Sequence, residues 1–241
     1  RYRTMMPIPA FLGFLGIGIP EPACDPHFNN VSLLLHMDGN NGSTTFTDSS
    51  INAVAVTAFS GAELSTSIVK YGTASGNLIA SGSTINCPDS ALFAFGGGLF
   101  TVECWVYRSS SGSGGSQALF SCRNTGVYCQ FVVRCSSTGS ISWLIADETI
   151  THWGSTATLV GVTIPADTWT HVALVGTTTI FRLYVNGIAS TTTVDRLGAW
   201  TNTTSPIYIG NDPDGKLIGY IDDFRITKGV ARYTANFTPP D

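Results

Sequence analysis

Two adjacent aspartates lie within an otherwise apolar stretch near the C-terminus, GYIDDFRITKG. Side chains alternate between the two faces of a strand, which groups Asp222 with Tyr220, Phe224 and Ile226. The same alternation predicts that Asp223 and Arg225 point to water. A carboxylate on an apolar face needs a partner, which is a set of backbone N–H donors, a cation or a metal ion.

The elements that position this strand are also strands. Apolar or alternating runs separated by turn residues occupy residues 31–37, 53–59, 99–108, 140–147, 169–176 and 179–185. Asn186-Gly187 is a type I′ hairpin signal, and residues 118–123 and 127–135 form a second expected hairpin. No segment has a sustained helical period, so we expect single helical turns at most, near 88–92 and 229–233. The pattern predicts an all-β, two-sheet antiparallel sandwich.

Composition narrows the class of protein. The 241 residues include 43% hydrophobic and only 12% charged residues, which is typical of a turn-rich β protein. The formal net charge is −4 with 12 Lys and Arg and no basic stripe, which argues against nucleic acid as a partner. No apolar run has the length of a membrane span, so we expect no membrane partner.

Six cysteines are too few for a disulfide scaffold at this length. Cys122 and Cys129 flank a predicted hairpin turn, where they would lie opposite each other and could form a disulfide. The alternative is that all six are buried thiols that pack as small hydrophobic groups. The chain has no CxxC pair and four histidines, so a zinc site is not expected.

The first thirty residues differ from the rest of the chain. Arg1 and Arg3 precede an apolar, Gly- and Pro-containing stretch, an arrangement that resembles a signal peptide. We interpret residues 1–30 as an extended N-terminal arm for assembly, followed by one domain over 31–241. Its apolar side chains would be covered by the chain's own domain or by a neighbouring subunit; they are Phe11, Leu12, Phe14, Leu15, Ile17 and Ile19.

Five motifs occur in a characteristic order: LLLHMDGNNGSTTFTDSS, FTVECWVYRS, WTHVALVGTTTIFRLYVNG, IYIGND and GYIDDFRITKGVARYT. This series resembles the LamG-like jelly roll of the concanavalin A-like lectin/glucanase superfamily, especially the copies found in bacteriophage virion proteins. The resemblance covers roughly Val31 to Pro239 and implies two stacked, curved antiparallel sheets.

The resemblance also implies a partner for Asp222. In related glucanases and lectins, an aspartate on the last strand often serves a structural calcium together with the turn after the first strand. Here those positions are Asp222 and the Asp38-Gly39 turn, and calcium prefers such oxygen ligands. The alternative is that Asp222 accepts backbone N–H bonds from the Asp38–Gly42 turn without a metal. No other cofactor is expected.

Catalysis is not expected from this sequence. Glycosidases on this fold use paired carboxylates, with acidic residues at alternate positions of one strand. Glu103 has no acidic partner two residues away, and Asp147 and Glu148 are direct neighbours. No serine lies in a G-x-S-x-G elbow, and His171 lacks an evident nucleophile and orienting acid.

Sugar recognition would use exposed aromatic side chains at one rim, and the candidates are Trp153, Trp200 and Tyr107. The alternative for each of the two tryptophans is packing against a neighbouring loop or subunit. The N-terminal arm favours a non-enzymatic virion component of a phage, either a capsid decoration protein or a tail or fibre protein. Its partners would be copies of itself and other virion proteins. A carbohydrate-binding adhesin module and a secreted lectin-like protein are the alternatives.

Overall fold

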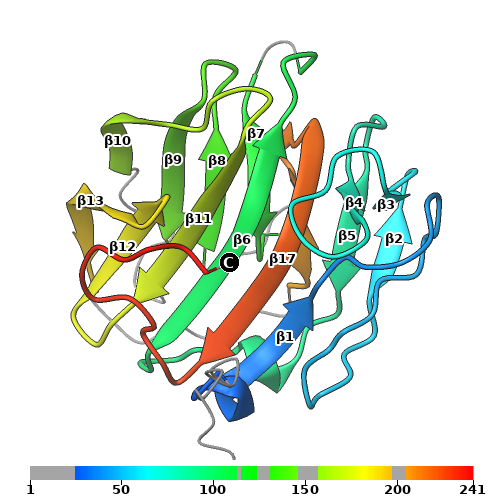
Figure 1. Cartoon of the computed structure of the whole chain (residues 1–241). Coiled ribbons are helices and arrows are strands. Elements are labelled where there is room, and N and C mark those ends of the chain that lie inside the picture. The colour runs from blue at the N-terminus through cyan, green and yellow to red at the C-terminus, as the bar shows by residue number, and fades with distance from the viewer. Residues whose placement is uncertain (1–24, 113–114, 124–130, 146–156, 197–204, 241) are drawn as a thin grey trace, which may run out of the picture.

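The computed structural model describes residues 25–112, 115–123, 131–145, 157–196 and 205–240, and every structural statement below refers to them. Two antiparallel sheets stack face to face, as the sequence predicts (Figure 1). The described helical elements are two single 3-10 turns, η1 (Phe28–Asn30) and η2 (Ala91–Phe93). The second was expected, whereas residues 229–233 form no helical turn.

The large sheet has eight strands in the order β13-β12-β11-β6-β17-β4-β3, and β1 also pairs with β17. Its strands are β1 (Val31–Leu35), β3 (Glu63–Ser65), β4 (Ser75–Asn77), β6 (Phe100–Arg108), β11 (Trp169–Gly176), β12 (Ile180–Val185), β13 (Ile188–Asp195) and β17 (Gly219–Lys228). β17 pairs with β6 along one edge; its other edge is shared by β1 and β4.

The second sheet has seven strands in the order β10-β9-β8-β7-β14-β5-β2. Its strands are β2 (Thr57–Phe59), β5 (Thr84–Cys87), β7 (Gln117–Ser121), β8 (Phe131–Cys135), β9 (Ser140–Ile145), β10 (Ala157–Thr163) and β14 (Ile207–Ile209). A short hairpin of β15 (Asn211–Asp212) and β16 (Gly215–Lys216) precedes β17.

The hydrophobic core lies between the sheets, and β6 shows how the sequence divides between its two sides. Its apolar positions, Phe100 to Val106 in steps of two, belong to the core cluster. Glu103, Trp105 and Tyr107 occupy the other side, which we call the outer face of the large sheet. This division follows the two-residue period of the strand.

A β-bulge in β17 changes the expected faces of the aspartates. Asp222 pairs with Trp105 and Arg225 pairs with Glu103, so two residues of β17 oppose the single Cys104 of β6. Directly paired residues point to the same side, which places Asp222 and Arg225 together on the outer face. The prediction that Asp222 shares a face with Phe224 and Ile226 is therefore wrong, because those two belong to the core.

The predicted type I′ hairpin at Asn186-Gly187 is confirmed. Both residues have positive φ, +48° and +75°, and the turn joins β12 to β13. Asn186 also reaches the neighbouring strand, since its Oδ1 accepts a hydrogen bond from the His171 backbone N–H at 2.9 Å. This turn therefore helps to fix the position of His171.

Cys87, Cys104 and Cys135 are buried thiols that pack in the core, and Cys122 is also buried there. Burial raises the pKa of Cys87 and Cys135 to about 12 each, so both remain protonated. Cys129 and the apolar arm residues 11–19 lie outside the described residues. Among the helices of the described part of the chain, none is long and apolar enough to cross a membrane.

Candidate functional site

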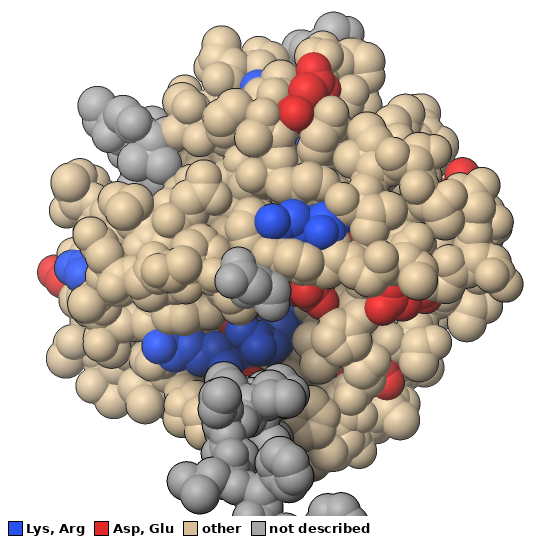
Figure 2. Space-filling view, viewed as in Figure 1, with Lys and Arg blue, Asp and Glu red and all other residues tan. Residues whose placement is uncertain are grey.

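The outer face of the large sheet is partly covered by two segments. The C-terminal segment (residues 229–240) crosses in front of β11 and β12 (Figure 1). The β3–β4 loop (residues 66–74) lies near the other end of this face. Figure 2 shows that charged side chains are sparse over this side of the molecule and gather near its middle.

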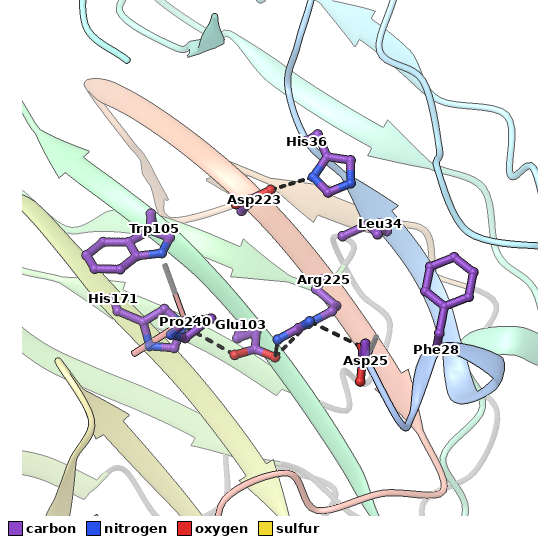
Figure 3. A pocket seen from close by; sticks show the side chains of 10 residues that line it. All are labelled: Asp25, Phe28, Leu34, His36, Glu103, Trp105, His171, Asp223, Arg225 and Pro240. Atoms are coloured by element: carbon purple, nitrogen blue, oxygen red, sulfur yellow. Dashed lines mark hydrogen bonds and ion pairs between the residues drawn. The ribbon is translucent and has the colours of Figure 1, made fainter. Parts of the chain in front are cut away.

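A pocket of about 310 Å³ opens beside the C-terminal segment, and we call it the outer-face pocket. Its walls come from the N-terminal turn, β1, β6, β11, β17 and the C-terminal segment (Figure 3). It is lined by Asp25, Phe28, Leu34, His36, Glu103, Trp105, His171, Asp223, Arg225 and Pro240.

Glu103 is the centre of a buried ionic cluster at the base of the pocket. Its side chain is 2% exposed, and its Oε1 accepts from Arg225 Nε at 2.9 Å and pairs with Arg225 Nη2 at 2.8 Å. Its Oε2 accepts from the Tyr233 hydroxyl at 2.7 Å and lies 3.2 Å from His171 Nε2. Both oxygens are therefore fully engaged, as a buried carboxylate requires.

A second carboxylate completes this cluster, which we call the Glu103 network. Asp25 accepts from Arg232 through both oxygens, at 3.0 and 2.7 Å, and Arg225 Nη1 lies 3.4 Å away. Arg232 Nε also donates to the Thr227 hydroxyl at 2.6 Å. The network thus joins the N-terminal turn, β6, β11, β17 and the C-terminal segment.

Electrostatics keep both carboxylates ionised. Burial alone raises the pKa of Glu103, but hydrogen bonding from His171 and the Arg225 charge outweigh it and lower that pKa below its usual value. The pKa of Asp25 is lowered in the same way, because its bonds to Arg232 and to the His27 backbone exceed the effect of burial. Neither group can supply a proton near neutral pH.

A separate ion pair forms another wall of the pocket. His36 Nδ1 lies 2.7 Å from Asp223 Oδ1, and the His36 side chain is half exposed. The hydrogen bond to Asp223 raises the pKa of His36 above its ordinary value. Asp223 has a φ of +44°, the conformation of the bulge, and this turns its side chain toward β1.

Trp105 forms the aromatic wall, with Lys70 Nζ 4.1 Å from its ring centroid and Tyr71 in edge contact at 5.8 Å. His171 pairs directly with Trp105 across β11 and β6, and their ring centroids are 5.3 Å apart. Two buried nitrogens here have no hydrogen-bond partner among the described residues, Trp105 Nε1 and His171 Nδ1.

Tyr107 lies on the outer face but away from this pocket. Its ring makes edge contacts with Trp169 at 5.6 Å and with Tyr220 at 5.9 Å. Both partners belong to neighbouring strands of the same sheet. The other two expected sugar-binding aromatics, Trp153 and Trp200, lie outside the described residues.

Asp222 is fully buried, but its donors differ from those expected. Its Oδ2 accepts from the backbone N–H groups of Lys70 and Tyr71 at 2.9 and 3.1 Å, and its Oδ1 accepts from Asp223 N–H at 3.0 Å. The β3–β4 loop therefore takes the place of the Asp38–Gly42 turn in the hydrogen-bonded alternative.

These donors also bear on calcium. N–H groups point at both oxygens of Asp222, where a cation ligand would instead offer free lone pairs. Asp38 binds the other end of the same loop, through the backbone N–H and hydroxyl of Thr73, and Gly39 N–H donates to that hydroxyl. No group of three or more His, Cys, Asp or Glu suited to a metal occurs in the described part of the chain. This donor set does not fit a calcium ion.

Sequence reasoning missed most of the Glu103 network and the pocket's ion pair. Asp25, Arg225, Arg232 and Tyr233 come from both ends of the chain, and no local spacing connects them to Glu103. The sequence signal that could have indicated the network is ARYT at residues 231–234, because an arginine and a tyrosine that follow a strand can donate hydrogen bonds to a buried acid.

Comparison with known proteins agrees with this architecture. Residues 79–232, more than half of the chain, match the family described as the Concanavalin A-like lectin/glucanases superfamily. The chain belongs to this superfamily. No curated protein matches it.

Solved structures extend the comparison to the fold. The binding domain of Paraclostridial Mosquitocidal Protein 1 is 15% identical with a TM-score of 0.63, over 84% of this chain and 50% of that one. The binding domain of botulinum neurotoxin serotype D is 17% identical with a TM-score of 0.63, over 84% and 49%. The serotype G binding domain is 15% identical with a TM-score of 0.61, over 83% and 48%. This chain therefore spans about half the length of these proteins, and at such identity the likeness concerns the fold.

Proposed function

We propose that the chain is a non-enzymatic recognition module that binds a glycan in the outer-face pocket. The observation that carries this proposal is the lining of the pocket, where one aromatic wall, Trp105, faces polar and charged groups from β6, β11 and β17 and from the chain on either side of β1. An aromatic face beside fixed polar groups suits a sugar ring, which has apolar C–H faces and a rim of hydroxyls. The lectin-like fold and the binding domains of similar fold are consistent with it.

The carboxylates of the pocket favour binding over hydrolysis. A glycosidase needs one carboxyl group that is protonated near its working pH as the general acid. Glu103 and Asp25 have lowered pKa values and are held by arginines. The pKa of Asp222 is raised to about 7, mainly by burial, but both of its oxygens hold backbone N–H groups.

Screening the protein against a glycan array, with a reducing-sugar assay in parallel, tests this function. We expect a defined set of bound glycans and no release of reducing sugar from β-glucans or other polysaccharides. Hydrolysis that disappears in Glu103→Gln would overturn the non-enzymatic assignment, and an array without bound glycans would overturn the glycan assignment.

We also propose a place for the chain in a bacteriophage particle, as a capsid decoration, tail or fibre protein. The support is the order of its sequence motifs together with the apolar stretch at residues 11–19, which would bury surface on a neighbouring subunit. Mass spectrometry of purified particles should find this chain with residues 1–24 still attached. A chain found only as free secreted protein, cleaved near Ala23, would contradict this role.

A further inference from the structure

We propose that Trp105 and His171 form a hydroxyl-recognition pair that selects a neutral sugar, resting on the proposed glycan-binding function. One ligand hydroxyl accepts a hydrogen bond from Trp105 Nε1–H and donates its own proton to His171 Nδ1. Pro240 moves off the pocket to admit it. The pair is thereby the specificity-determining element of the outer-face pocket.

The starting observation is two polar atoms that are buried without a partner. His171 is 1% exposed and Trp105 is 9% exposed, and both line the pocket. Trp105 Nε1 and His171 Nδ1 have no hydrogen-bond partner in the described part of the chain. Burying a polar group without a partner is costly, so such atoms commonly mark a place for a ligand or a bound water.

The chemistry of the two atoms follows from their neighbours. His171 Nε2 faces the ionised Glu103 carboxylate at 3.2 Å, so in a neutral imidazole the proton belongs on Nε2. Nδ1 is then a hydrogen-bond acceptor, whereas an indole Nε1–H is only a donor. A hydroxyl group is both donor and acceptor, so one hydroxyl can satisfy both atoms. A carboxylate or sulfate oxygen has no proton to offer to Nδ1.

The charged groups that line the pocket also favour a neutral ligand; Lys70, which does not line the pocket, lies over the Trp105 ring with its Nζ 4.1 Å from the ring centroid. The pocket-lining guanidinium of Arg225 is engaged by Glu103 and Asp25, and the His36 ring is engaged by Asp223. The two carboxylates neutralise the Arg225 charge within the protein. An acidic sugar would have to compete with a carboxylate that is already in place.

Pro240 is the movable part of this site. Figure 3 places it beside His171, below Trp105, and a proline has no N–H to offer either nitrogen. Its carbonyl accepts from the Tyr71 hydroxyl at 3.2 Å, and the preceding backbone anchor of the segment is Phe237 N–H to the Gly187 carbonyl at 3.0 Å. Pro240 is exposed on its other side. Its displacement breaks one exposed hydrogen bond.

Binding measurements with the full chain test this pair. The probe is the methyl glycoside of the sugar that the glycan array selects, together with its monodeoxy analogues, measured by calorimetry. We expect Trp105→Phe, which removes the N–H and keeps an aromatic ring, to weaken binding about tenfold, as for one lost hydrogen bond. One deoxy analogue should lose the same factor with wild type and nothing further with Trp105→Phe.

Two variants test whether a loss of binding comes from the Trp105–His171 pair or from a general disturbance of the outer face. Trp169→Phe makes the same change one strand away and outside the pocket, and it should leave the affinity unchanged. Tyr71→Phe removes the hydroxyl that holds Pro240, and it should leave binding equal or stronger. Thermal melting of each variant checks that it is folded.

The possible failures are distinct. An array on which wild type binds nothing overturns the proposed function, and the pair with it. Neutral-glycan binding that survives in Trp105→Phe overturns the pair alone. A preference of wild type for acidic glycans would also overturn the pair alone. So would a deoxy series in which no analogue loses more than about threefold in affinity, because that loss is smaller than the loss of one hydrogen bond.

Discussion

At the scale of single residues, the Asp222 carboxylate shows how a buried charge couples folding to pH. Burial is the main cause that raises its pKa from 3.8 to about 7, and the neighbouring Asp223 charge adds to it. The backbone N–H bonds from Tyr71, Lys70 and Asp223 act in the opposite direction. The native protein therefore holds this proton at pH values where the unfolded chain has released it.

The pH dependence of stability follows from this difference. The contribution of Asp222 is fully present below pH 3.8 and is lost as the pH rises through about 7. One proton corresponds to a slope of about −1.4 kcal/mol per pH unit in the free energy of unfolding. In urea unfolding between pH 5 and 6.5, below the range in which the raised pKa of His36 acts, wild type should show this slope and Asp222→Asn should not. Equal slopes in the two proteins would contradict the assignment.

Measurements on Asp222 also distinguish a calcium site from a hydrogen-bonded carboxylate without a metal. Since N–H donors occupy both of its oxygens, we expect wild type to melt at the same temperature with and without a chelator. Asp222→Ala should lose about 1–3 kcal/mol in either condition, because the N–H groups of Lys70 and Tyr71 are left unpaired. A chelator that lowers the melting temperature of wild type but not of Asp222→Ala would restore the calcium hypothesis.

Glu103 presents the opposite case, a buried charge that its partners hold ionised. Glu103→Gln leaves Arg225 with less compensation in a buried site, so we expect a loss of about 3–5 kcal/mol in the free energy of unfolding. Asp25→Asn serves as the control, because Asp25 is 22% exposed and its loss should cost about 1 kcal/mol. Similar costs for the two variants would show that the network is not centred on Glu103.

At the scale of elements, the bulge in β17 organises the outer face. It brings Asp222 and Arg225 to the same side and turns Asp223 toward His36. A β17 without the extra residue would place Arg225 on the core side, away from Glu103. The bulge is thus the local feature on which the Glu103 network depends.

Substitutions at Asp223 test the bulge directly. Its φ of +44° is accessible to glycine and tolerable for asparagine, but it is strained for a β-branched residue. We expect Asp223→Val to lose about 2 kcal/mol or more, from strain and from the lost His36 bond. Asp223→Asn, which tolerates this conformation, should lose less than about 1 kcal/mol. Unfolding by urea measures both, and equal losses would argue against a strained bulge.

The sequence was sufficient for those elements whose signals are local. The alternation in β6 and the Asn186-Gly187 turn each depend on residues that are adjacent in the sequence, and both predictions are confirmed. The bulge was not predictable, because the single extra residue of β17 is defined only by its pairing with β6. The partners of Glu103 were missed for the same reason, since Arg225 and Tyr233 lie 122 and 130 residues after it, and His171 lies on the neighbouring strand β11.

At the scale of the whole molecule, both ends of the described chain meet over one sheet. Asp25 from the N-terminal turn and Arg232 from the C-terminal segment are bound to each other on the outer face. The pocket exists only because these distant segments border it. Asp25 therefore belongs structurally to the domain, although the sequence placed residues 1–30 in a separate arm.

Two truncations separate the domain from the arm. Removal of residues 1–24 leaves the Asp25–Arg232 pair intact, so the protein should melt within about 2 °C of the full chain, as expected for a change below ~0.5 kcal/mol. Removal of residues 1–28 also deletes Asp25 and leaves Arg232 and Arg225 with one carboxylate fewer. This variant should melt at a clearly lower temperature. We expect a decrease of about 4 °C for each 1 kcal/mol lost from the free energy of unfolding, which is the upper end of the range for a domain of this size.

The same pair of proteins tests the assembly role. If the apolar arm anchors the chain in a particle, both truncations should fail to incorporate, and the shorter deletion should do so while fully folded. Incorporation is measured by mass spectrometry of purified particles, and binding of the array-selected glycan is measured on the free proteins. Loss of incorporation with retained glycan binding in the 1–24 deletion would assign the two activities to different parts of the chain. Normal incorporation of that variant would contradict an anchoring arm and leave the outer-face pocket as the functional surface.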